Sequence, residues 1–137
     1  MLTGPVPRRT AYEDTGGPFF LDAEGVQADL LPDDLSLCIE TPAGLVVCLG
    51  CCHAGVVNTV RHCLEVTGAH GLAALIGGMH LLRAKEERLE KTTEALQAYT
   101  ISRVVPCHCT GDAASAYLAE RLGSSVQQGY AGLKISF

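Results

Sequence analysis

Apolar and polar residues alternate over residues 35–40 and again over residues 45–49, with Thr-Pro-Ala-Gly at residues 41–44 between them. Two alternating runs joined by a turn of this composition predict a β-hairpin. Beyond the hairpin, segments with a helical period alternate with short apolar runs that suit buried strands. The expected elements are helices over residues 56–67, 86–99 and 112–122 and strands over residues 72–76, 104–105 and 133–137.

The register of the hairpin decides which side chains share a face of the sheet. We expect Leu37 to face Leu49, because this register makes the two apolar faces coincide. The same register places Cys38 directly opposite Cys48, within disulfide reach. Two reduced, buried thiols are the alternative, and a reducing compartment favours them.

Two strands followed by three helix–strand units are typical of an α/β fold. We therefore expect a mixed sheet that begins with an antiparallel hairpin and continues in parallel β-α-β units. Residues 1–32 are rich in proline and glycine and show no sustained period, so we interpret them as an irregular arm. Residues 33–137 are expected to form the folded domain.

Composition narrows the function classes. The net charge is −5 and aromatic residues make up 5% of the chain, which argues against a groove that binds nucleic acid through phosphate contacts and stacked bases. No apolar stretch approaches the about 18 residues that cross a bilayer. The first residues lack the apolar core of a secretory signal, so we expect a cytoplasmic protein that is not in a membrane. A small-molecule substrate is the favoured partner.

Three histidines stand just beyond apolar, strand-like runs: His53, His80 and His108. In α/β sheets, ligand groups converge at strand ends and in the loops that leave them. Imidazole is a common ligand of zinc and other transition metals. The sequence therefore predicts that these three side chains converge on a metal ion. A hydrogen-bonded structural role is the alternative for any one of them alone.

Cysteines and glycines flank two of these histidines, in Cys-Cys-His-Ala-Gly at residues 51–55 and Cys-His-Cys-Thr-Gly at residues 107–111. The thiols could bind the metal or simply fill space. Glycine beside a helix start could also accept a phosphate or carboxylate of a substrate. A thiol nucleophile beside His108 is a weaker hypothesis, because sequence neighbours on a strand point apart. No catalytic residue can be assigned.

Several blocks resemble the C-terminal half of metallo-β-lactamase-fold hydrolases, especially the branch of the dihydropterin ribofuranosyl-aminobenzene phosphate synthases. The matching blocks lie at residues 3–8, 45–58, 76–81, 87–92 and 105–111. The resemblance implies half of an αββα sandwich with one or two metal ions, zinc or another divalent transition metal, at one end of the sheets. It implies that His53 and His108 are ligands and that His80 lies at or beside the site.

The chain departs from that family in two ways. It lacks the H-x-H-x-D-H cluster of the N-terminal half, and Cys51 stands where many relatives have a bridging Asp. We therefore expect a truncated or split hydrolase whose missing half comes from a second polypeptide. Because half a sandwich leaves a sheet face uncovered, we also expect a homodimer or larger complex. A non-catalytic metal-binding or scaffold domain is the alternative function.

Overall fold

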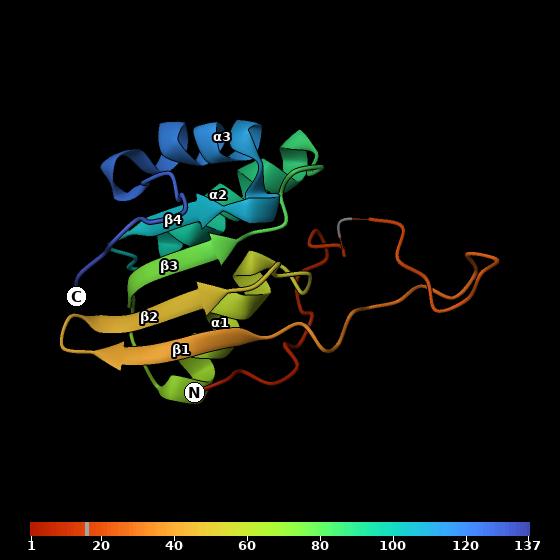
Figure 1. Ribbon diagram of the computed structural model, residues 1–137, viewed down its shortest axis with the longest axis horizontal. Helices are drawn as coiled ribbons and strands as arrows, with labels where there is room; N and C mark the ends of the chain where they lie inside the picture. Colours follow the sequence, from red (N-terminus) through yellow and green to blue (C-terminus); the bar gives the residue numbers. More distant parts are fainter. Residues whose placement is uncertain (16) are drawn as a thin grey trace.

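A computed structural model describes residues 1–15 and 17–137. Within them, one four-stranded sheet has the strand order β1-β2-β3-β4 (Figure 1). The strands are β1 (Ser36–Thr41), β2 (Gly44–Leu49), β3 (Leu72–Gly78) and β4 (Val104–Cys107). The helices are α1 (Val56–Thr67), α2 (Glu86–Ala98) and α3 (Asp112–Leu122), with short 3-10 turns at His108–Thr110 and Gly123–Ser125.

The sheet is mixed, as the sequence predicts. β1 runs antiparallel to β2, whereas β2, β3 and β4 are parallel to one another. A helix links each parallel strand to the next, so the carboxyl ends of β2, β3 and β4 lie along one edge, as their arrowheads in Figure 1 show. The loops that carry the three candidate histidines all leave from this edge.

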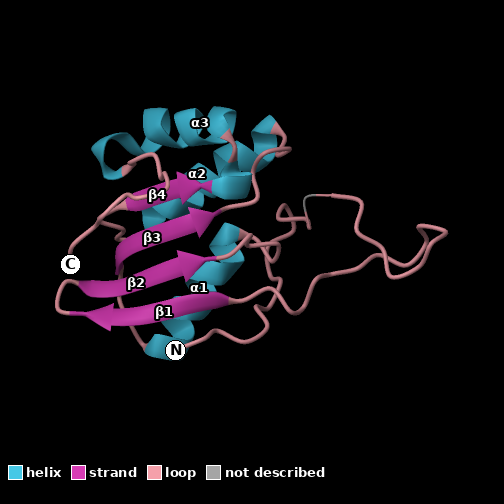
Figure 2. Ribbon diagram, viewed as in Figure 1, coloured by secondary structure: helices cyan, strands magenta, loops and turns pink. Residues whose placement is uncertain are grey.

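All three helices contribute to a core on one face of the sheet, and Figure 2 shows α1 and α2 behind the strands. α1 follows from the helical spacing of Val56, Val60 and Cys63, which are fully buried against the sheet. Gly68 ends this helix in the left-handed region, with φ 70°, and donates its N–H to the carbonyl of Leu64. The predicted helices are thus confirmed to within a residue at their ends.

The predicted hairpin register is wrong by one residue. Leu37 lies opposite Cys48, and Cys38 lies opposite Val47. The turn has only two central residues, because Thr41 pairs with Gly44 and its hydroxyl donates to the Gly44 carbonyl at 2.7 Å. A one-residue slip moves every side chain to the other face.

Cys38 and Cys48 therefore point to opposite faces and do not form a disulfide. Cys38 is buried in the helix-side core, whereas Cys48 packs beside Val46 and Ile76 on the other face. Both are free thiols. The alternative of two reduced cysteines is the correct one.

The same slip makes the second face of the sheet apolar, and this face is exposed to solvent at β1. Leu37 and Ile39 are 38% and 42% exposed on this face. Val46 and Ala74 continue the apolar side chains across the central strands, where they are buried, at 3% and 0% exposed. Over β3 and β4, the C-terminal segment borders a cleft of about 560 Å³. Its lining includes Ile76, Val105, Tyr130, Leu133 and Phe137.

The predicted strand over residues 133–137 is not present. Residues 126–129 run along the free edge of β4 instead, where Gln127 donates to the Val104 carbonyl and Gly129 donates to the Pro106 carbonyl, each at 2.9 Å. The last residues lie near the sheet face, where Leu133 and Phe137 line a cleft together with Ile76 and Val105. In the described part of the chain, no helix is long and apolar enough to span a bilayer.

The first 35 residues form no strand or helix in their described part. Met1 and Leu2 extend the free edge of β1, where the Cys38 N–H donates to the Met1 carbonyl at 2.8 Å. Residues 17–35 make a long excursion, visible at the right of Figure 1. Within this excursion, an isolated antiparallel bridge pairs Phe20 with Ala28.

Candidate metal centre

The ends of the three parallel strands approach one another closely because two glycines terminate β3. A Cβ on Gly77 would lie 2.3 Å from the Leu49 carbonyl oxygen. A Cβ on Gly78 would lie 2.6 Å from the Gly50 carbonyl oxygen and 2.7 Å from the Cys109 sulfur. Only glycine allows this approach without a shift of the backbone. The loops after β2 and β4 are thereby drawn together across the end of β3.

Each of the three loops that follow β2, β3 and β4 contains a residue in the left-handed backbone region. The φ angles are 62° at Cys52, 48° at His80 and 52° at His108. Residues other than glycine adopt this conformation at a cost in free energy, and such residues cluster at functional sites. The strain turns the chain sharply where each candidate ligand leaves its strand.

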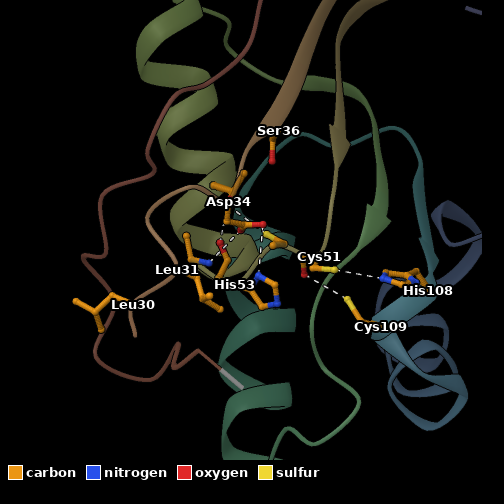
Figure 3. Close-up of polar contacts among 12 residues, drawn as sticks. Leu30, Leu31, Asp34, Ser36, Cys51, His53, His108 and Cys109 are labelled. Carbon is orange, nitrogen blue, oxygen red and sulfur yellow. Dashed lines mark hydrogen bonds and ion pairs between the residues drawn. The ribbon is translucent and has the colours of Figure 1, made fainter. Parts of the chain in front are cut away.

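Cys51, His108 and Cys109 form a compact thiol–imidazole group. The Cys51 sulfur lies 3.2 Å from Nε2 of His108, and the Cys109 thiol contacts the Cys51 carbonyl oxygen at 3.3 Å (Figure 3). The three possible ligand atoms all lie within 4.8 Å of one another. In the described ranges 1–15 and 17–137, no other group of three or more potential ligands is this compact.

His53 and His80 form a neighbouring pair rather than part of that group. Their ring centroids are 4.5 Å apart in an edge-to-face arrangement, with Phe19 5.6 Å from the His53 ring. Nδ1 of His53 lies 3.5 Å from a carboxylate oxygen of Asp34. Contact with a carboxylate is the usual way in which a metal-binding histidine is oriented, because it directs Nε2 toward the ligand site.

In the structure, the His53 ring thus lies beside the His80 ring, whereas the His108 ring lies beside the thiols of Cys51 and Cys109. The ligand atoms of the three histidines do not form a group within 4.8 Å of one another among the described residues. Sequence reasoning missed Asp34, because it lies outside every motif. It also missed the contact of Cys51 with His108, because 57 residues separate them.

The arm at the start of the chain holds the His53 loop in place. Arg8 donates to the His53 carbonyl at 2.6 Å and to the Leu30 carbonyl at 3.0 Å. The backbone N–H groups of Arg9 and Thr10 both donate to Oδ1 of Asn58, at 2.9 and 3.0 Å. These long-range contacts fasten the arm to the first turn of α1.

The anion site expected at the start of α1 is filled by the chain itself. The buried Glu13 carboxylate accepts the backbone N–H groups of Val57 and Asn58, at 2.8 and 2.9 Å. A Cβ on Gly55 would lie 2.3 Å from this carboxyl group, so glycine makes room for it. The Glu13 carboxylate therefore takes the place that a substrate anion would occupy at this helix N-terminus.

The cysteines near the site differ in their electrostatic surroundings. Burial raises the pKa of the Cys52 thiol far above its ordinary value, so this thiol stays protonated and contacts the Thr59 hydroxyl at 3.2 Å. Burial also raises the pKa of Cys109 to about 11, and the adjacent Cys51 thiol adds to the rise. Without a cation, Cys109 is therefore a neutral thiol at pH 7.

Comparison with known proteins identifies the type of fold. A solved metal-dependent hydrolase of the β-lactamase superfamily matches 99% of this chain with a TM-score of 0.87 and 33% sequence identity. The chain has a metallo-β-lactamase-like α/β fold. The expected resemblance is confirmed, although the match covers only 52% of the hydrolase.

Two curated proteins of Methanocaldococcus jannaschii support the same relationship. The 7,8-dihydropterin-6-methyl-4-(β-D-ribofuranosyl)-aminobenzene-5'-phosphate synthase is 32% identical over 123 residues, which are 90% of this chain and 42% of the synthase. An uncharacterized protein is 27% identical over 111 residues, or 81% of this chain and 40% of that protein. No protein-family profile matches the chain. The metallo-β-lactamase-like chain thus spans about half the length of its structural neighbour and less than half of these relatives.

Replacement of Glu13 tests whether the arm stabilises the domain through α1. Glu13→Ala is expected to lower the free energy of unfolding by about 2–4 kcal/mol, because two buried N–H groups lose a charged acceptor. Glu65→Ala removes an exposed pair with Arg9 and should cost less than about 1 kcal/mol. Urea unfolding followed by circular dichroism measures both. Equal effects of the two substitutions would show that the Glu13 contacts do not stabilise the helix.

Proposed function

We propose that this chain supplies part of the metal centre of a hydrolase that acts on a small molecule. The observation that carries the proposal is that histidine-bearing loops leave three adjacent parallel strands at one edge of the sheet. The similarity to a metal-dependent hydrolase over 99% of the chain supports it. A phosphorylated substrate is consistent with the name of the related synthase.

The residues present suit a transition metal such as zinc. His53 is oriented by Asp34, and His80 and His108 leave neighbouring strand ends. We infer that these three histidines are the ligands that the chain contributes to the centre. A bound divalent ion would polarise a carbonyl or phosphoryl oxygen and lower the pKa of water toward about 7.

Other residues of this chain would hold the histidine ligands in position around that ion. Asp34 holds the His53 ring through Nδ1, and Arg8 holds the same residue through its carbonyl. Phe19 packs against the His53 and His80 rings and restricts the access of water to them. Orientation of ligands by such contacts commonly changes metal affinity or activity by about 10- to 100-fold.

We infer that a second polypeptide covers the open face of the sheet and completes the sandwich. Leu37 and Ile39 are exposed apolar side chains at this face, and a cleft of about 560 Å³ lies over β3 and β4. Large uncovered apolar surfaces favour association. The match covers 52% of the structural neighbour, so that hydrolase contains about as much chain again. Without that polypeptide, the same face would join two copies of the chain.

A non-catalytic metal-binding domain is the second candidate function. It is favoured by the group of Cys51, His108 and Cys109, which lies entirely within this chain. Such a domain would bind metal but would not hydrolyse substrates.

Hydrolysis of bis(4-nitrophenyl) phosphate in the presence of zinc distinguishes the two functions. We expect weak turnover by the chain alone and at least about tenfold more by a complex with a co-purifying polypeptide, because that polypeptide adds metal ligands. His53→Ala should remove this turnover. His70→Ala should not, because His70 lies in the loop before β3, at the sheet edge opposite the carboxyl ends of the parallel strands. A zinc-bound complex with no turnover would support the non-catalytic domain instead. Unchanged turnover after His53→Ala would contradict the inference that His53 is a ligand of the catalytic ion.

Association through the open face can be tested by placing a charge on it. Ile39→Lys is expected to convert a dimer or larger assembly into a monomer, because burial of an unpaired ammonium is costly. Val66→Lys provides the control, since Val66 is equally exposed, at 46%, but lies on α1. Sedimentation velocity at micromolar concentration measures the assembly. A monomeric unmodified chain would contradict the proposal.

A further inference from the structure

We propose that a cavity between the N-terminal arm and the start of α2 binds the phosphate monoester group of a small molecule. The cavity has a volume of about 410 Å³. Its lining includes two residues of the arm and four cationic side chains of α2 and the loop before it: Tyr12, Asp14, Arg83, Lys85, Arg88 and Lys91. None of the histidines and cysteines that the structure describes lines this cavity, so it is separate from the candidate metal centre.

The buried guanidinium of Arg88 is the feature that points to a ligand. Its side chain is only 6% exposed, and Nη1 pairs with the Asp14 carboxylate. Nε and Nη2 are buried, and neither has a hydrogen-bond acceptor within residues 1–15 and 17–137. These two nitrogens form the edge of a guanidinium that binds two oxygens of one phosphate or carboxylate. Because buried donors without acceptors are unfavourable, this edge favours an anion in the cavity.

The charges around the cavity favour a doubly charged anion. Lys91 is paired with Glu87 at 2.6 Å. Arg83 and Lys85, in contrast, make no ion pair within the part of the chain that the structure describes. The net charge of the whole chain is −5, so two uncompensated cations at one cavity are a local feature. A phosphate monoester carries close to two negative charges at pH 7, whereas a single carboxylate carries one.

The cations at the cavity differ in exposure. Arg83, Lys85 and Lys91 are exposed, whereas Arg88 is buried. Exposed side chains change rotamer within nanoseconds, so these three can move aside and then close over a bound group. Nε and Nη2 of Arg88 are closed off from solvent in the free protein, and entry of the anion therefore requires this movement.

The position of the cavity connects it to the candidate metal centre. Arg83 also lines a second cleft, of about 330 Å³, together with Phe19 and His80. A molecule whose phosphate lies beside Arg88 can therefore extend past Arg83 toward His80. The phosphate group can belong to the substrate of the proposed hydrolase or to a separate ligand. Binding in the cavity itself does not depend on the proposed function.

Calorimetric titration of the full chain with phenyl phosphate tests for this site. Metal is first removed with a chelating resin, so that phosphate cannot bind to an ion. We expect saturable binding of about one phenyl phosphate and weaker binding of phenyl sulfate, which has the same ring but a single charge. Arg83→Ala/Lys85→Ala should lower the affinity for phenyl phosphate at least about tenfold, because two charged donors are lost. Lys134→Ala removes an exposed cation outside the cavity and should leave the affinity unchanged.

Arg88→Lys tests the guanidinium edge itself. This substitution keeps the charge but removes the two parallel donors, so the affinity should again fall at least about tenfold. Circular dichroism checks the fold of each variant, and the exposed pair Arg83→Ala/Lys85→Ala decides the result if Arg88→Lys does not fold. No saturable binding by the unmodified chain, or equal affinity in folded Arg83→Ala/Lys85→Ala, would overturn the proposal.

Two further measurements separate this site from the proposed hydrolase and identify the source of the phosphate. His53→Ala should bind phenyl phosphate as the unmodified chain does, even though turnover by the complex is lost. Competitive inhibition of turnover by phenyl phosphate, absent in Arg83→Ala/Lys85→Ala, would assign the group to the substrate. Binding of phenyl phosphate that leaves KM unchanged would assign it to a separate ligand.

Discussion

The close approach of the strand ends at Gly77 and Gly78 is the constraint on which the candidate site depends. A side chain at either position would collide with the backbone at the end of β2, at Leu49 or Gly50. Because Gly77 and Gly78 have no side chains, β2, β3 and β4 can end side by side. The loops that follow these strands therefore meet, although they are distant in sequence. The histidines and thiols owe their proximity to this backbone geometry more than to any attraction between them.

The irregular arm is the second structural requirement. Arg8 and Glu13 reach from the arm to the His53 loop and to the start of α1. Asn58 receives two further backbone contacts from the arm. An extended segment with little regular structure therefore fixes the orientation of the loop after β2. This explains how the rings of His53 and His80 can be held without a covering second layer.

Local patterns predict the helices and the parallel strands well, because their apolar periods and their glycine ends are encoded within a few residues. The hairpin register was not predictable from apolar alternation, since β1 exposes Leu37 and Ile39 and buries Cys38. The geometry of the turn decided it. The contacts of Asp34 with His53 and of Cys51 with His108 join distant segments, so no local pattern could reveal them.

Anomalous diffraction at the zinc absorption edge, from crystals of the zinc-loaded chain, tests most directly whether the gathered strand ends form a metal centre. A peak within bonding distance of Nε2 of His108, at the ends of β2, β3 and β4, is the predicted result. Zinc bound only away from these loops, or no ordered zinc, would contradict the account.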